Sequence, residues 1–313
     1  MQNNFFDQVL INQKIAALKY IQKNGNEQLK QNSLSLSFSF HGIPLEIFSS
    51  SQELIIQLKQ IFPADWYQNF QTPTKLFFYS PVEFPDFFDS IEAFESEQNP
   101  DCYLSESFII QRDFAALKMS DNDFAIICEN EISDGLHNFI RWFLPQELQK
   151  NEKYLLHSGT VSSSAGAFIF LGHSGTGKST ICEYSQEFDS EKLEIFSDDM
   201  NILWQKEDSQ LVVLPAAMGG IFPCQKKHLE KPKDVKAIFW PVQSDVNQLK
   251  KITKQSMASK LVASFSNLNW DLVVNKEQLI LNTYDMTKDV DCFEMKFRHS
   301  ADFWKLIYQE YSI

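Results

Sequence analysis

One motif limits the possible folds of this chain more than any other feature of the sequence. Residues 172–179 read Gly-His-Ser-Gly-Thr-Gly-Lys-Ser and match the phosphate-loop pattern G-x-x-x-x-G-K-[ST] in full. In such a loop, glycines let successive backbone N–H groups turn toward phosphate oxygens, and the positive end of the following helix attracts the same anion. An apolar run at 167–171 precedes the motif as a strand should, which disfavours the alternative of a glycine-rich turn that binds nothing. The sequence therefore predicts a strand, a phosphate loop and a helix.

The motif also predicts which residues contact the nucleotide and its metal. The expected nucleotide-binding residues are Gly172, His173, Ser174, Gly175, Thr176, Gly177, Lys178, Ser179 and Thr180. We expect Lys178 to bridge the β- and γ-phosphates and to face solvent when no ligand is bound. We expect the Ser179 hydroxyl to ligate Mg²⁺. ATP and Mg²⁺ are therefore the expected cofactors, and the choice of ATP over GTP stays open.

Two adjacent carboxylates, Asp198 and Asp199, follow a strand candidate at 193–196. Phosphoryl transfer requires one carboxylate for the metal and often a second one to accept the proton of the attacking hydroxyl. Such groups belong at a strand end beside the phosphate loop. Because adjacent residues of a strand point to opposite faces, we expect the two carboxylates to have different roles. The alternative is an acidic turn, which the preceding phosphate loop disfavours.

The chain is expected to form two domains. Residues 1–150 contain helical patterns and alternating strands, such as Leu34–Phe40, that are typical of an α+β unit with mostly antiparallel strands. Pro145 is expected to kink or end a helix, and the polar stretch 146–153 marks the boundary. Residues 151–313 are expected to form an α/β domain that carries the phosphate loop and opens with short strands at 154–157 and 160–162.

Charge and composition disfavour some classes of partner. The chain has 313 residues and a formal net charge of −13, with 28 lysines and arginines against 41 acidic residues. Binding nucleic acid or an anionic membrane requires an excess of basic side chains, so neither is an expected partner. No apolar run approaches the ~18 residues of a membrane span, and five scattered cysteines are typical of reduced thiols in the cytoplasm. Lys226, Lys227 and His228 are interpreted as a solvated charge cluster, with contact to an anionic ligand as the alternative.

These motifs together resemble the catalytic domain of HPr kinase/phosphorylase and the HPr-kinase-like proteins, a family that shares its nucleotide-binding core with phosphoenolpyruvate carboxykinase. The resemblance covers roughly residues 154–313. It is carried by Leu156-His157, by residues 171–179 and by Ser197-Asp198-Asp199, and the interval from His157 to Gly172 equals the interval between the family's active-site histidine and its loop. The resemblance implies an α/β fold with an HPr kinase/phosphoenolpyruvate carboxykinase-like P-loop core and a mixed sheet, preceded by the α+β domain.

The resemblance also implies roles for individual side chains. Asp198 is the base that takes the proton from the acceptor hydroxyl, and Asp199 and Ser179 hold Mg²⁺. His157 lies near the γ-phosphate and, with Lys178, completes the catalytic set. From the residues alone, a single histidine after an apolar run is more often structural, so the catalytic role of His157 depends on the matched spacing.

The resulting prediction is a Mg²⁺-dependent, cytoplasmic phosphotransferase that moves the γ-phosphate of ATP to a hydroxyl. The expected acceptor is a serine of a protein, a peptide or a small molecule. HPr itself is not implied, because Thr180 stands where HPr kinases usually have a glutamate after the loop serine. Two alternatives stay open: a nucleotide-gated binding module with little or no kinase activity, and a phosphorylase that runs the reverse reaction. The N-terminal domain is expected to help select the substrate. The sequence leaves the oligomeric state open.

Overall fold

The computed structural model describes residues 3–24, 33–96, 102–105, 107–129, 134–217, 226–229, 231–265 and 276–313. The chain divides into two compact units, Met1–Arg141 and Trp142–Ile313. The division falls inside helix α5 (Asp134–Gln149) and therefore lies before the expected boundary after residue 150. Pro145 does not end this helix, because the buried side chains of Leu144 and Leu148 extend its apolar side past the proline.

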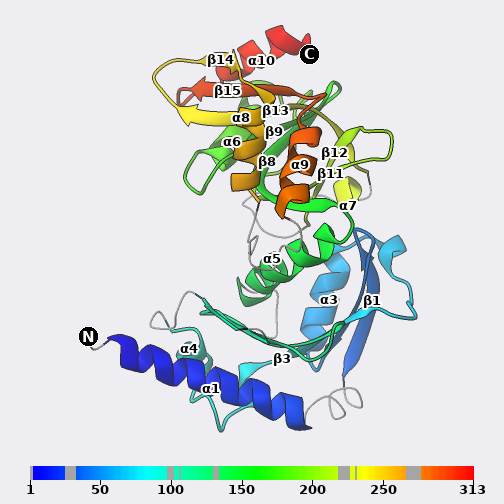
Figure 1. Cartoon of the computed structure of the whole chain (residues 1–313), viewed down its shortest axis with the longest axis vertical. Helices are drawn as coiled ribbons and strands as arrows, with labels where there is room; N and C mark the ends of the chain where they lie inside the picture. The colour runs from blue at the N-terminus through cyan, green and yellow to red at the C-terminus, as the bar shows by residue number, and fades with distance from the viewer. Residues whose placement is uncertain are drawn as a thin grey trace. The chain divides into compact units, whose positions relative to one another are not determined.

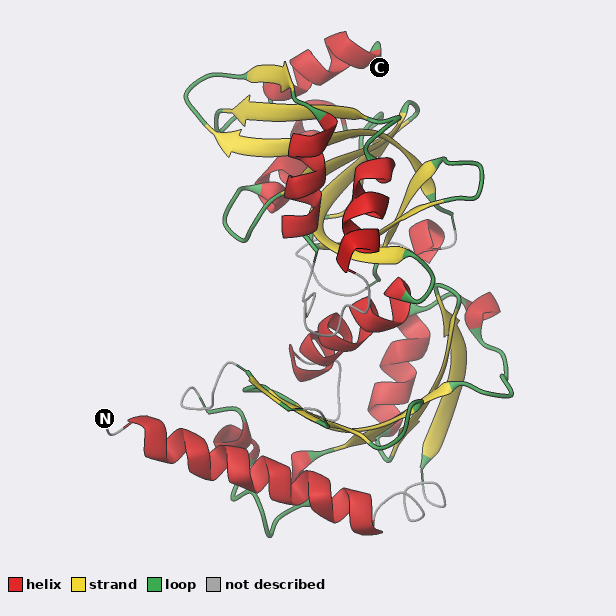
Figure 2. Ribbon diagram, viewed as in Figure 1, coloured by secondary structure: helices red, strands yellow, loops and turns green. Residues whose placement is uncertain are grey.

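The first unit is built on a seven-stranded mixed sheet (Figures 1 and 2). Its strands in chain order are β1 (Leu34–Phe40), β2 (Ile43–Ser49), β3 (Thr74–Tyr79), β4 (Tyr103–Leu104), β5 (Phe108–Ile110), β6 (Ala115–Lys118) and β7 (Asp123–Ile127). Across the sheet they follow the order β1-β2-β3-β7-β6-β5-β4. The pairs β2–β3 and β3–β7 are parallel and the other neighbours are antiparallel. Antiparallel pairs predominate, as expected, and the two parallel pairs make the sheet mixed.

Helices cover both faces of this sheet (Figure 2). Helix α1 (Asn3–Asn24) packs on one face, where its Leu18 joins Phe77 of β3 in a buried cluster. The next residue of β3, Phe78, contacts Phe139 of α5 with ring centroids 5.8 Å apart. Consecutive strand residues point to opposite faces of a sheet, so Phe77 packs against α1 on one face and Phe78 packs against α5 on the other. The remaining helices are α3 (Gln52–Ile61), α4 (Ile91–Phe94) and the 3₁₀ turns η1 (Ala64–Trp66) and η2 (Pro81–Glu83).

The second unit contains an eight-stranded mixed sheet. Its strands are β8 (Lys153–Ser163), β9 (Gly166–Leu171), β10 (Glu194–Ser197), β11 (Met200–Gln205), β12 (Leu211–Pro215), β13 (Lys233–Gln243), β14 (Gln248–Lys251) and β15 (Asp291–Phe297). Strand β9 lies between β8, to which it is antiparallel, and β13, to which it is parallel. The first half of β8 pairs with β11 and the second half with β9 and β10. The two short strands expected at 154–157 and 160–162 are thus one strand that changes partners.

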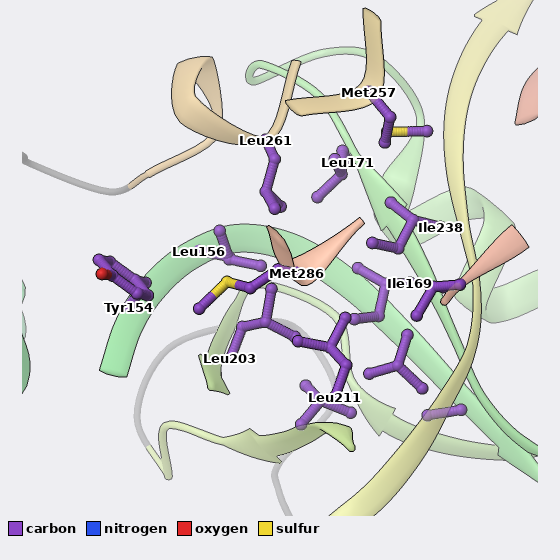
Figure 3. Close-up of a cluster of buried hydrophobic side chains, with 14 of the residues drawn as sticks. Tyr154, Leu156, Ile169, Leu171, Leu203, Leu211, Ile238, Met257, Leu261 and Met286 are labelled. Atoms are coloured by element: carbon purple, nitrogen blue, oxygen red, sulfur yellow. The ribbon is translucent and has the colours of Figure 1, made fainter. Parts of the chain in front are cut away.

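Two buried clusters on opposite faces of β9 and β13 hold this sheet between helices. The helices are α6 (Lys178–Asp189), α7 (Lys226–Leu229), α8 (Lys254–Ala263), α9 (Lys276–Met286) and α10 (Phe303–Tyr311). The cluster in Figure 3 joins the strands to α8 and α9, and its members include Ile169, Leu171, Ile238, Met257, Leu261 and Met286. The other cluster joins them to α6 and α10, and its members include Phe168, Phe170, Ile181, Phe239 and Trp304. The carboxyl end of β9, from which the phosphate loop leaves, is therefore fixed from both sides.

Membrane-spanning segments and disulfides are the two features that the composition disfavours. Within the described ranges, no helix has the length and apolar character needed to cross a lipid bilayer. Cys102, Cys128, Cys182 and Cys292 are free thiols, as expected, and Cys224 lies outside the described residues.

Candidate functional site

The phosphate-loop motif leaves the carboxyl end of β9 and leads directly into α6. Helix α6 begins at Lys178, and the residue before it, Gly177, has a φ of 95°. This left-handed conformation favours glycine. A side chain there would also collide with Phe297, whose Cζ lies 2.9 Å from the position of an added Cβ. The loop thus connects a buried strand to a helix, as the sequence predicts, and its last glycine is required by backbone conformation and by packing.

Lys178 folds back onto the start of its own loop. Its side chain is buried, and Nζ donates hydrogen bonds to the carbonyl oxygens of Gly172 at 2.8 Å and His173 at 2.9 Å. Burial lowers the pKa of this ammonium, and the charge of Asp199 partly offsets the effect. The expectation that Lys178 faces solvent is therefore wrong, because two main-chain carbonyls take the place of water around the ammonium.

A pocket with a volume of about 470 Å³ lies at the phosphate loop. Its lining residues are His157, Ser174, Gly175, Gly177, Lys178, Ser179, Thr180, Asp198, Asp199 and Gln243. They come from four separate segments: β8, the loop with the start of α6, the link between β10 and β11, and the end of β13. Residues that are far apart in the sequence therefore share one cavity, and both carboxylates and the histidine singled out from the sequence are among them.

Three of the expected nucleotide-binding residues do not line the pocket. Gly172 is buried at the start of the loop, and its carbonyl faces Lys178. The His173 ring packs edge-on against Trp240 of β13, with centroids 6.1 Å apart. The Thr176 hydroxyl donates a hydrogen bond to the His173 carbonyl at 2.9 Å. In this structure these residues make contacts within the loop and with β13 that stabilise its conformation.

Asp198 and Asp199 lie in the link between β10 and β11 and have different neighbours. Asp198 is 2% exposed, and the pKa of the Cys182 thiol in α6 is raised by burial and then by the charge of Asp198. Asp199 contacts His157, with Oδ1 3.3 Å from Nε2 of the imidazole. Its carbonyl accepts a hydrogen bond from the Ser158 N–H at 2.9 Å, which ties this link to β8.

His157 reaches the pocket because β8 changes partners at this point. The residue pairs with Met200 of β11, while the next residue, Ser158, pairs with Leu171 at the end of β9. The His157 N–H donates a hydrogen bond to the Ser264 carbonyl at 2.9 Å. The side chain is 32% exposed, so it faces an open cavity and not a closed core.

The donor set of the pocket fits Mg²⁺ bound together with phosphates. Ser179, Asp198 and Asp199 offer a hydroxyl and carboxylate oxygens, the ligands that Mg²⁺ prefers. In the part of the chain that the structure describes, no group of three or more His, Cys, Asp or Glu residues could hold a metal ion. Because Mg²⁺ is usually held by one or two carboxylates plus substrate phosphates, such a group is not required here.

Gln243 is the pocket residue that the sequence does not predict. It is the last residue of β13, and its Nε2 donates a hydrogen bond to the Gly175 carbonyl at 3.2 Å. The apolar pattern at 235–241 indicates the strand but ends before Gln243. Only the parallel pairing of β13 with β9 brings this side chain to the loop.

The basic cluster at 226–228 lies against another part of β10. Lys227 and His228 both contact Glu194, the first residue of β10, whereas Asp198 follows the last one. Burial raises the pKa of Glu194, but these two contacts outweigh it and lower the pKa below its ordinary value. His228 is buried, so a solvated cluster is the wrong description for this residue, and the side chain of Lys226 lies outside the described residues.

Comparisons with known proteins find distant structural likenesses only. No protein-family model matches the chain, and no curated protein matches it. The chain is similar to the solved structure of the HPr(Ser) kinase/phosphatase from Coxiella burnetii, with 13% sequence identity and a TM-score of 0.25, over 46% of this chain and 85% of that chain. A TM-score of this size carries no argument about the function of the pocket.

Proposed function

We propose that this chain is a Mg²⁺-dependent kinase that transfers the γ-phosphate of ATP to a hydroxyl, with serine as the acceptor group. The observation that carries the proposal is that the phosphate loop, Asp198, Asp199 and His157 line one pocket. A protein that only stores a nucleotide needs the loop and at most one carboxylate for the metal. Transfer of a phosphoryl group to a hydroxyl requires further groups, and the second carboxylate and the histidine can supply them.

The loop and Lys178 bind the triphosphate in this proposal. Lys178 Nζ, which donates to the Gly172 and His173 carbonyls, turns to the phosphate oxygens when the triphosphate binds. Ser179 and Asp199 would hold Mg²⁺, which would neutralise charge on the phosphates. His157 orients Asp199 through the contact between Nε2 and Oδ1. A carboxylate that binds a metal is ordinarily oriented by such a hydrogen-bonding partner.

Asp198 is the general base in this proposal. It lines the pocket, yet it is only 2% exposed, so little bulk water reaches it. An acceptor hydroxyl that enters the pocket would meet this carboxylate in a water-poor environment, where the hydrogen bond that orients the hydroxyl is strong. The acceptor belongs to a protein, a peptide or a small molecule, and the first unit of the chain contributes to its selection.

The test uses ATP labelled in the γ-phosphate. The protein is incubated with this ATP, Mg²⁺ and a cell extract, and the labelled species are identified together with the amino acid that carries the label. The proposal predicts phosphoserine that depends on Mg²⁺ and is absent with Lys178→Ala. Nucleotide binding without any labelled acceptor would instead support the gated binding module. Release of label from a phosphorylated acceptor by inorganic phosphate would identify the phosphorylase.

A further inference from the structure

Strand β13 contacts the phosphate loop at two points. Trp240 packs against the His173 ring near the start of the loop, and Gln243 donates a hydrogen bond to the Gly175 carbonyl at 3.2 Å. Strand β13 runs parallel to β9, with Phe239 opposite Phe170. The carboxyl ends of the two strands therefore lie at the same edge of the sheet, which allows both contacts. The neighbouring strand therefore holds the loop that leaves β9.

The Gly175–Thr176 peptide follows a glycine in an open part of the loop. Gly175 is exposed, has a φ of 81°, and has no atom within 4 Å of the position that a Cβ would occupy. A flip of this peptide rotates ψ of Gly175 and φ of Thr176, and glycine leaves the first of these angles weakly restricted. A flip exchanges the directions of the carbonyl oxygen and the N–H, because the peptide unit is planar and trans.

The orientation of this peptide matters for an anionic ligand. In the observed orientation the carbonyl oxygen accepts from Gln243, and the Thr176 N–H donates to the His173 carbonyl at 3.3 Å. Gln243 also lines the pocket, so the bond that fixes the peptide lies at the wall of the cavity. If the peptide turned its carbonyl oxygen toward a bound phosphate, the two partially negative groups would repel each other.

We infer that Gln243 is a positioning residue that keeps the Gly175–Thr176 peptide in its phosphate-binding orientation. This inference rests on the nucleotide site proposed above and adds a residue to it. Gln243 acts on the loop and not on the nucleoside. Its loss therefore weakens the binding of any ligand held through its phosphates.

The experiment compares Gln243→Met, which keeps the length of the side chain without a donor, with Gln243→Glu, which replaces the donor by a negative acceptor. Gln248→Met is the matched control, because Gln248 is exposed and does not line the pocket. Dissociation constants are measured by calorimetry for MgATP and for inorganic tripolyphosphate with Mg²⁺. We expect Gln243→Met to raise both constants by the same factor, ~3- to 10-fold, the effect of losing one neutral hydrogen bond. Gln243→Glu should raise both further, and the control should match the wild type.

The outcomes separate this inference from the proposed function. Unchanged constants in Gln243→Met overturn the positioning role and leave the nucleotide site intact. A loss for MgATP without a loss for tripolyphosphate also overturns it, because that result assigns Gln243 to the nucleoside. Failure of the wild type to bind MgATP overturns both proposals. An equal melting temperature of wild type and Gln243→Met without ligand is expected, since the side chain is exposed.

Discussion

Nε2 of His157 lies 3.3 Å from Oδ1 of Asp199, which joins strand β8 to the link between β10 and β11 at the pocket wall. The contact engages one oxygen of Asp199 and orients the carboxylate. Asp198, the adjacent residue, is more deeply buried and lies near Cys182 instead. The two carboxylates therefore have different surroundings, which is the basis for assigning them different roles.

Replacing His157 should weaken the use of Mg²⁺ more than the binding of nucleotide. Without the imidazole, Asp199 loses the partner that orients it, and loss of such a partner typically costs 10- to 100-fold in metal affinity. We expect His157→Ala to raise the Mg²⁺ concentration for half-maximal label transfer by ~10-fold or more. His299→Ala, at an exposed position outside the pocket lining, is the control. An unchanged Mg²⁺ titration would show that His157 does not act through Asp199.

Replacing Lys178 should abolish the stabilisation that MgATP gives to the protein. A ligand that binds only the folded state raises the melting temperature, and Lys178→Met removes the charge expected on the β- and γ-phosphates. Lys192→Met is the control, since Lys192 is exposed beyond the other end of α6. The measurement is a thermal shift with and without MgATP. If the wild type and Lys178→Met gain the same melting temperature, the pocket is not the nucleotide site.

The two carboxylates should separate by phenotype. We expect Asp199→Asn to raise the Mg²⁺ requirement, because an amide is a poorer ligand than a carboxylate. We expect Asp198→Asn to keep the affinity for MgATP while turnover falls ~10²–10⁴-fold, the usual contribution of a general base. Calorimetry with MgATP and a Mg²⁺ titration of turnover measure the two effects. Exchanged phenotypes would mean that the two roles are exchanged.

The first unit contains a buried lysine whose titration should appear in its stability. Lys14 is fully buried, its Nζ donates to the carbonyls of Gln111 and Arg112, and it lies over the Phe94 ring. Burial lowers its pKa from 10.5 to about 7, and the charges of Asp113 and Glu95 oppose the effect. Between these two pKa values the unfolded chain binds more protons than the folded one, so stability rises with pH.

The size of this effect can be measured by chemical denaturation. From pH 7 to pH 9 the Lys14 contribution to the free energy of unfolding should increase by ~2 kcal/mol, from a pKa difference of this size. Lys14→Met removes the titrating group, so its stability should lack this increase. Parallel pH profiles of the wild type and Lys14→Met would contradict the lowered pKa.

Local patterns were sufficient to predict much of the pocket. The phosphate loop, the strand before it and the helix after it follow from residues 167–182, where glycine positions and apolar spacing act over short distances. The strand before Asp198 and Asp199 follows from its apolar residues in the same way. That these segments share one cavity with His157 was an inference from the resemblance, and in the structure it results from strand pairing.

The parts that were missed depend on contacts between distant residues. Gln243 reaches the loop only because β13 pairs with β9, and no local pattern encodes that neighbour. The motif describes the contacts of Lys178 with phosphates and gives no sign that the side chain bonds to two loop carbonyls. The parallel pairs β2–β3 and β3–β7 likewise join strands that are far apart in the chain. Strands β11 and β12 were not predicted at all.

The most direct measurement of the central claim is label transfer from γ-labelled MgATP, at saturating concentration, by the wild type and by Asp198→Asn. Both proteins are first shown by calorimetry to bind MgATP equally, so that any difference lies in the chemical step. The account predicts that the wild type labels a serine hydroxyl in a cell extract and that Asp198→Asn loses this activity by at least ~10²-fold. Equal labelling by the two proteins, or nucleotide binding by both with no labelled acceptor from either, would contradict it.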